Sequence, residues 1–116
     1  PKQGGSVIAR MNDTDGYRGW GVWLEKGKVG THLVNKWPEN AIKTLTRDAL
    51  PPNQWNHVVI SYNGSSKAEG IQIFVNGAKQ VVAPSNNSLT ETLHTDVPLK
   101  IGQRNNSDFT PGTGLQ

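Results

Sequence analysis

The sequence of 116 residues contains no cysteine. This absence excludes disulfide bonds, thiolate zinc sites and cysteine nucleophiles. The sequence also has no apolar run close to the roughly 20 residues that a bilayer-spanning helix needs. The N-terminal segment Pro1–Gly5 lacks the pattern of a signal peptide. We therefore expect no membrane span, and we expect any export signal of a parent protein to lie outside this sequence.

Runs of one charge sign are missing as well. The 12 Lys and Arg residues exceed the 9 Asp and Glu residues by a formal net charge of +3. They are scattered from Lys2 to Arg104 and never form a run of three. Nucleic-acid-binding domains concentrate positive charge on one face. The charge pattern therefore predicts no nucleic-acid partner.

What the sequence does contain is a series of short strand-like segments separated by turn residues. The 13 Gly and 7 Pro residues supply these turns, and no helical periodicity extends beyond about two turns. Lys26–Gly27 and Asn76–Gly77 are expected to form hairpin turns. The pattern predicts a single all-β domain over residues 1–116, built as an antiparallel two-sheet sandwich. The expected strands are Ser6–Arg10, Trp20–Glu25, Lys28–Asn35, Ile42–Thr46, Trp55–Tyr62, Ile71–Val75, Lys79–Val82 and Pro98–Gln103.

Two of these segments alternate clearly between apolar and mixed residues. Val58, Ile60 and Tyr62 share one face of their strand, and Ile71, Ile73 and Val75 share one face of the next. We expect these faces to meet the opposite sheet. The mixed faces, which carry His57, Val59, Ser61, Gln72 and Phe74, are expected to lie on the outside.

The same region carries a family resemblance. Trp55–Gly64 (WNHVVISYNG) and Ile71–Gly77 (IQIFVNG) resemble the signature of laminin-G-like domains, which belong to the concanavalin A-like lectin/glucanase superfamily. The resemblance implies a jelly-roll sandwich. Further segments resemble a bacterial subgroup found in large multidomain proteins with cytochrome-c-like regions; these are Ile8–Met11, Tyr17–Trp20, His32–Ile42 and Thr95–Gly102.

Domains of this family usually carry a strand before Ser6–Arg10 and another beyond the end of this sequence. The resemblance therefore implies a fragment of a larger protein that lacks its first and last strands. Uncovered sheet edges favour pairing with a second chain. We expect self-association through such edges.

The enzymatic alternative requires paired carboxylates across a scissile glycosidic bond. Catalytic members of the family carry a Glu-x-Asp-x-x-Glu strand, which has no counterpart here, and the glutamates Glu25, Glu39, Glu69 and Glu91 stand apart. His57 and Ser61 share a strand face but would lie about 13 Å apart. The sequence therefore favours a domain that is not an enzyme.

Aromatic side chains are the principal candidates for ligand binding, because sugars stack their apolar faces on them. Trp20 and Trp23 have an odd spacing and must point to opposite faces of one strand, so at least one of them is expected in the core. Trp55 is also expected in the core, and Trp37, before Pro38, is expected to be exposed. The candidate carbohydrate site consists of Trp20, Trp23, Trp37 and Phe74 with the polar neighbours Arg18, Asn35 and Asn40. The alternative is that these aromatic residues simply fill the core.

Asp13 and Asp15 lie in a segment that resembles part of a calcium loop. The family resemblance implies calcium at a loop rim, and the alternative is a turn whose Asp side chains accept hydrogen bonds from backbone amides. Together these features predict a non-catalytic, carbohydrate-binding or adhesion module of an exported bacterial protein, located outside the cytoplasm with a polysaccharide as its partner. The alternative is a structural or protein-interaction domain with no sugar site.

Overall fold

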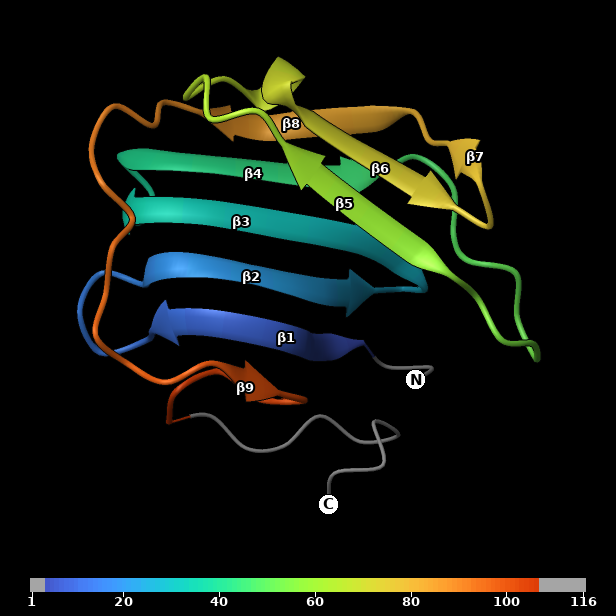
Figure 1. The fold of residues 1–116 in the computed structure, drawn as a ribbon, viewed down its shortest axis with the longest axis horizontal. Coiled ribbons are helices and arrows are strands. Elements are labelled where there is room, and N and C mark those ends of the chain that lie inside the picture. The colour runs from blue at the N-terminus through green and yellow to red at the C-terminus, as the bar shows by residue number, and fades with distance from the viewer. Residues whose placement is uncertain (1–3, 107–116) are drawn as a thin grey trace.

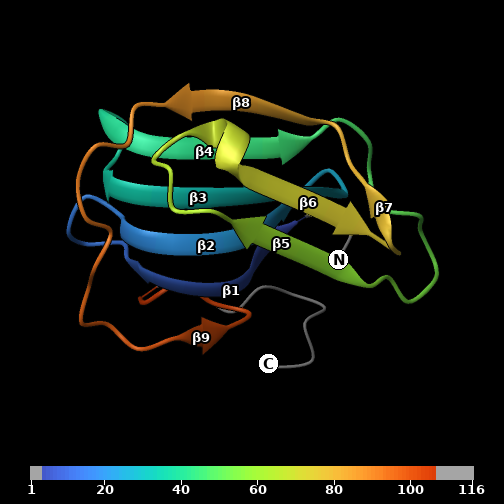
Figure 2. The same ribbon diagram turned by 45° about the horizontal axis from the view of Figure 1, so that its top comes forward.

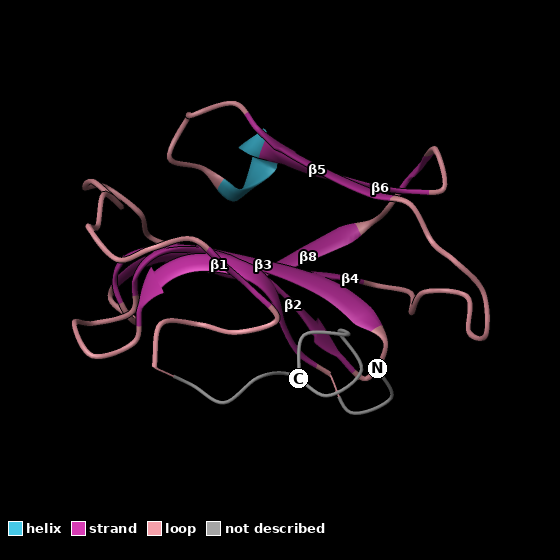
Figure 3. Ribbon diagram, turned by 60° about the horizontal axis from the view of Figure 1, so that its bottom comes forward, coloured by secondary structure: helices cyan, strands magenta, loops and turns pink. Residues whose placement is uncertain are grey.

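A computed structural model describes residues 4–106 of the chain. The strands form two antiparallel sheets that face each other (Figures 1 and 3). The larger sheet has the order β8-β4-β3-β2-β1-β9, and the smaller sheet has the order β5-β6-β7. The strands are β1 (Gly5–Asn12), β2 (Arg18–Glu25), β3 (Lys28–Lys36), β4 (Asn40–Thr46), β5 (Val58–Tyr62), β6 (Ile71–Val75), β7 (Ala78–Lys79), β8 (Val82–Asn87) and β9 (Lys100–Ile101), with a short 3₁₀ helix at Ala68–Gly70. The predicted all-β, two-sheet sandwich is confirmed.

The two hairpin turns predicted from the sequence are present. Lys26 and Gly27 have φ values of 51° and 77°, and Asn76 and Gly77 have φ values of 51° and 82°. Two consecutive positive φ angles match the twist of the flanking strands, which is why glycine and asparagine favour such turns. The first turn joins β2 to β3 and the second joins β6 to β7.

The main core lies between the two sheets. Its buried residues are Val29, Leu33, Ile42, Ala68, Ile71, Ile73 and Leu89. Val58, Ile60 and Tyr62 of β5 pack against this cluster, whereas His57, Val59 and Ser61 are exposed. The predicted inward and outward faces of β5 and β6 are therefore confirmed.

The strand expected at Trp55–Tyr62 begins only at Val58. Trp55 is 98% exposed, so its predicted place in the core was wrong. The chain before β5 is irregular, and in it the Asn56 side chain donates to the Pro51 carbonyl (2.9 Å). Because this backbone belongs to no ladder, the strand alternation does not extend to Trp55.

The strand expected at Lys79–Val82 is divided between the two sheets. β7 ends at Lys79 in the smaller sheet, and β8 begins at Val82 at the edge of the larger sheet. In Figures 1 and 2, β1 and β9 lie outside the area that the smaller sheet covers. Between residues 4 and 106, no strand pairs with the outer edge of β5, and no helix is long and apolar enough to cross a membrane.

Candidate functional site

The face of the larger sheet that points away from β5 and β6 carries the candidate site. Figure 3 shows the larger sheet arching, with its hollow side on this outer face. Strand register fixes which residues lie there. Ala9, Gly21, His32 and Lys43 form one row across β1 to β4. The flanking rows on the same face are Met11, Gly19, Val34 and Ala41 on one side, and Trp23, Gly30 and Leu45 on the other.

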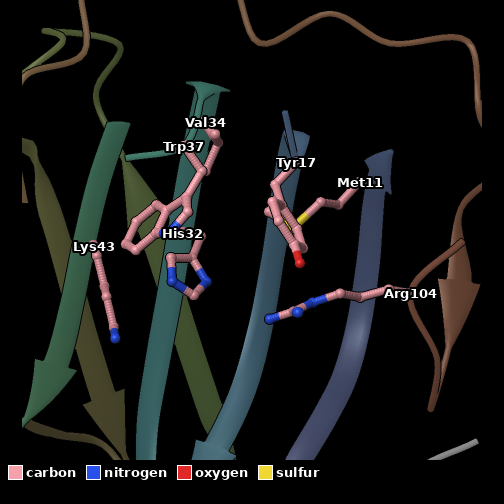
Figure 4. A pocket seen from close by; sticks show the side chains of 7 residues that line it. All are labelled: Met11, Tyr17, His32, Val34, Trp37, Lys43 and Arg104. Carbon is pink, nitrogen blue, oxygen red and sulfur yellow. The ribbon is translucent and has the colours of Figure 1, made fainter. Parts of the chain in front are cut away.

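Glycines in two of these rows shape the surface. Gly19 of β2 adds no side chain between Met11 of β1 and Val34 of β3, and Gly21 adds none beside His32. The result is a pocket of about 290 Å³, which lies at the lower end of the range for small-ligand sites. Its lining residues, shown in Figure 4, are Met11, Tyr17, His32, Val34, Trp37, Lys43 and Arg104.

Aromatic rings build one side of the pocket. The His32 ring lies 5.0 Å from the Trp23 ring and meets the Trp37 ring edge-on at 5.2 Å, measured between centroids. Trp23 is 7% exposed, and its indole lies against β3 where Gly30 has no side chain. A Cβ atom at Gly30 would come within 2.4 Å of the indole. The glycine is therefore required for this ring arrangement.

Two cations flank the rings. The Lys43 ammonium lies 5.2 Å from the Trp23 ring centroid and 5.8 Å from that of Trp37, and the Arg104 guanidinium lies 5.7 Å from that of Tyr17. In Figure 4, Lys43 and Arg104 approach from opposite sides of His32. Cations at such distances are attracted by the negative ring faces.

His32 is neutral at pH 7. The pKa of His32 is lowered to about 4, mainly by burial and also by the positive charges of Arg104 and Lys43. Its Nδ1 atom is buried and has no hydrogen-bond partner among the described residues. A buried polar atom without a partner is costly.

The aromatic residues predicted from the sequence do not share one surface. Trp23 and Trp37 lie together at the pocket, and Trp37 is half-buried. Trp20 points to the opposite face and packs against the core between the sheets, as the odd spacing of Trp20 and Trp23 required. Phe74 lies on the outer face of the smaller sheet, paired with Val59. The structure therefore separates Trp20 and Phe74 from the pocket.

The predicted polar neighbours hold loops in place. The Arg18 side chain donates to the Asn35 carbonyl (3.1 Å), and the Asn35 amide donates to the Thr92 carbonyl (2.6 Å). The Asn40 amide donates to the Thr90 hydroxyl and accepts from the Thr90 backbone N–H, both at 2.8 Å. Asn35 and Asn40 thereby attach the segment that follows β8 to the larger sheet, and Arg18 joins β2 to β3.

Asp13 and Asp15 lie in the turn between β1 and β2. The Asp13 carboxylate accepts from the Asn106 backbone N–H at 3.1 and 3.3 Å, and Asp15 is exposed. Asn12, rather than an aspartate, accepts from the Thr14 amide and hydroxyl. Within residues 4–106, no group of three or more His, Cys, Asp or Glu residues could hold a metal ion. A calcium ion here would need backbone, amide and water oxygens in addition to the carboxylates of Asp13 and Asp15.

Sequence reasoning missed the pocket residues Tyr17, His32, Lys43 and Arg104. One signal could have found His32. The turn at Lys26–Gly27 fixes the register of β2 and β3, and this register places His32 opposite Gly21. The positions of Lys43 and Arg104 depend on β4 and on the segment after β9, for which the sequence has no comparable signal.

Comparison with known proteins gives one match. The family model described as the concanavalin A-like lectin/glucanases superfamily matches residues 1–114. No curated protein and no solved structure matches the chain significantly.

Proposed function

The chain belongs to the concanavalin A-like lectin/glucanases superfamily, and from this premise we propose that it is a non-catalytic carbohydrate-binding domain. The pocket on the outer face of the larger sheet is its proposed sugar site. The observation that carries the proposal is the aromatic wall of Trp23, His32 and Trp37 beside an open hollow. Small-ligand sites combine such apolar walls with a few polar groups.

The lining of the pocket supports binding without catalysis. Glycoside hydrolysis uses two carboxylates on either side of the bond that breaks. None of the seven described lining residues is Asp or Glu. The polar groups at the pocket are instead the His32 imidazole, the Lys43 ammonium, the Arg104 guanidinium and the Tyr17 phenol, which can position a sugar through hydrogen bonds.

The test of the proposal is glycan-array binding followed by titration of the Trp37→Ala variant. We expect the variant to bind the glycan at least tenfold more weakly, which corresponds to a loss of about 1.4 kcal/mol of binding free energy. The reason is that Trp37 supplies the half-buried ring of the pocket. Trp55→Ala is the matched control, since it removes an exposed indole elsewhere. Equal effects of the two substitutions, or no binding to any plant, algal or bacterial glycan, would contradict the proposal.

The setting of the domain is part of the proposal. We propose that it belongs to a larger exported bacterial protein, of the multidomain kind that its segments resemble, and tethers that protein to a polysaccharide outside the cytoplasm.

Calcium at the Asp13–Asp15 turn is a separate proposal that the pocket does not need. Bound calcium should raise the midpoint of thermal unfolding in millimolar calcium, and an unchanged midpoint would contradict the calcium proposal.

A second candidate function is protein interaction. It is favoured by the outer edge of β5, which no described strand covers, and by Trp55, which is 98% exposed just before that strand. An uncovered strand edge pairs readily with another chain. The two functions use different surfaces and do not exclude each other.

A further inference from the structure

The hydrogen bonds between β5 and β6 show which backbone groups of β5 are already used. The Asn76 N–H donates to the His57 carbonyl (2.8 Å) at one end of this ladder, and the Asn63 N–H donates to the Gly70 carbonyl (3.1 Å) at the other. In an antiparallel ladder, every second residue directs both its N–H and its C=O to the same neighbouring strand. The odd-numbered residues from His57 to Asn63 therefore face β6.

Three residues of β5 direct their backbone groups to the opposite, open edge of the sheet. They are Val58, Ile60 and Tyr62, which alternate with the residues that face β6. Within residues 4–106, no strand pairs with this edge. The edge thus presents N–H donors and C=O acceptors at the spacing of a β-strand, which is a template for one more strand.

The side chains of the same three residues face the core, but the core covers them only in part. They are half-buried, whereas the inward row of β6, which consists of Ile71, Ile73 and Val75, is at most 8% exposed. β6 has a strand on each side, and β5 has a strand on one side only. The missing cover of the β5 side chains therefore lies towards the open edge.

A hollow of about 330 Å³ lies between the sheets beside this edge. Its lining is mostly apolar and comes from both sheets, with Ile60 and Tyr62 from β5 and Trp20 and Val22 from β2 among its members. An edge strand with unpaired backbone groups thus lies next to apolar space. This combination suits an extended segment whose backbone pairs with β5 and whose side chains enter the hollow.

The larger sheet continues beneath the place that such a segment would occupy. Val22 pairs with Ile8 of β1, and Ile8 pairs with Ile101 of β9, so these three side chains share one face of the sheet. Ile101 is 56% exposed. In Figures 1 and 2, β1 and β9 lie outside the area that the smaller sheet covers. An added strand would therefore lie over an apolar floor.

A second folded copy of the chain offers few strands for this place. Among the described edge strands, β7 and β9 have two residues each. β8 contains Pro84, which has no backbone donor for a ladder. Of these strands, β5 itself is thus the best that a second copy can offer, and a peptide would compete with such pairing of two copies.

We propose that the edge of β5 and the hollow beside it bind an extended segment of a partner protein, in which apolar residues alternate with polar ones. The segment pairs antiparallel to β5, as the other strands of this sheet pair. Its residues opposite Val58, Ile60 and Tyr62 exchange backbone hydrogen bonds with them and share their inward face. The apolar side chains of the segment therefore enter the hollow. This inference rests on the second candidate function, protein interaction, and specifies the class of partner.

The first experiment compares two synthetic peptides of equal composition by fluorescence polarisation. The peptide KTITITITE alternates apolar and polar residues, and the peptide KIIITTTTE does not. We expect the alternating peptide to bind at least tenfold more tightly, because only alternation lets the apolar side chains enter the hollow while the backbone pairs with β5. Equal affinities would overturn the inference.

Methylation of the peptide backbone tests the pairing itself. The amide groups of the Ile residues face β5 in the proposed pairing, so N-methylation there should weaken binding at least tenfold. The amide groups of the Thr residues face away from β5, and a peptide methylated at the same number of these positions should bind like the unmodified one. Equal losses, or the reverse order, would overturn the antiparallel pairing.

Amide hydrogen exchange followed by NMR locates the peptide on the protein. The amides of Val58, Ile60 and Tyr62 should exchange more slowly when the alternating peptide is present. The amides of Val59 and Ser61 face β6 and serve as internal controls, since their protection should not depend on the peptide. Unchanged exchange of the first three amides at saturating peptide would overturn the inference.

A variant that fills the hollow tests the side-chain part of the recognition. Val22→Phe adds bulk inside the hollow and should weaken binding of the alternating peptide at least tenfold. Val81→Phe is the matched control, because Val81 is 57% exposed and outside any strand. Equal effects of the two substitutions would contradict binding in the hollow. If Val22→Phe fails to fold, as judged by thermal unfolding, the exchange pattern of the wild type decides.

The outcomes also separate this inference from the functions proposed above. If rising protein concentration protects the amides of Val58, Ile60 and Tyr62 but the peptide does not, the edge binds a second copy. The inference then fails, and the second candidate function stands. If neither protects these amides, both fail. The sugar site lies on the other face of the larger sheet, and its test with Trp37→Ala is independent of these results.

Discussion

At the scale of single residues, the protonation of His32, which lines the pocket, changes the free energy of unfolding. The folded protein holds its pKa at about 4, below the ordinary value of 6.5. Protonation is therefore resisted in the folded state and not in the unfolded chain. The contribution of the neutral imidazole is fully present above pH 6.5 and is lost as the pH falls from 6.5 towards 4. The loss amounts to about 3 kcal/mol over this interval.

This linkage is measured by urea unfolding of the wild type and of His32→Gln at several pH values between 7 and 4. Because the variant has no group to protonate at this position, we expect its free energy of unfolding to fall less over this interval. His57→Gln is the control, since His57 is exposed and lies before β5 on the other side of the molecule. Parallel pH profiles for the wild type and His32→Gln would show that His32 does not carry the linkage.

At the scale of elements, the contact of β2 with β3 depends on Gly30. A methyl group at this position would overlap the Trp23 indole, with its Cβ 2.4–2.6 Å from three ring atoms. Gly30→Ala should therefore displace the indole and destabilise the fold by about 1–3 kcal/mol, the usual cost of overpacking. Because His32 stacks on the same indole, the substitution should also weaken ligand binding at the pocket.

The matched control is Gly21→Ala, on the same face of β2. Its added Cβ would meet the Ala9 Cβ at 3.4 Å and the Met11 methyl at 3.9 Å, which are ordinary contacts. We expect the free energy of unfolding to change by no more than about 0.5 kcal/mol, because the added methyl group meets its neighbours only at ordinary contact distances. Chemical unfolding together with tryptophan fluorescence measures both variants. Equal stability of Gly30→Ala and Gly21→Ala would contradict the close packing of Trp23 on β3.

The elements also show how far the sequence determines the fold. The two hairpins were predictable because both turns carry glycine at the second position, Gly27 and Gly77, where positive φ is needed, and Asn76 also tolerates positive φ. The start of β5 was not predictable in the same way. A Trp followed by an alternating segment satisfies the strand pattern, but only pairing with β6 decides where the strand begins, and that pairing begins at Val58.

At the scale of the whole molecule, the pocket shows why much of the site escaped sequence reasoning. Trp23 and Trp37 were found because aromatic residues stand out in any sequence. Lys43 and Arg104 were missed because a lone cation is uninformative until the sheet order places it. The order β4-β3-β2-β1 brings Lys43 across the sheet from the segment after β9, and a partner 61 residues away along the chain (104 − 43) leaves no local signal.

The arrangement of the two sheets also determines where the domain can pair with another chain. The smaller sheet has only three described strands over a sheet of six, and β5 forms one of its edges. Beside β5, between the sheets, lies a hollow of about 330 Å³ lined mostly by apolar residues such as Trp20, Val22 and Ile60. A strand added at this edge would pair with the backbone of β5 and cover that hollow. We therefore expect the isolated domain to self-associate as its concentration rises.

Light scattering on a concentration series measures this association. Val59, 42% exposed on β5, is the position for a blocking charge, because Lys on an edge strand opposes pairing. Val59→Lys should remain monomeric at concentrations where the wild type associates. Val81→Lys places the same charge at a more exposed valine outside any strand, 57% exposed, and should associate like the wild type. A wild type that stays monomeric at every concentration, with β5 edge amides protected from hydrogen exchange, would show that this edge is not an association surface.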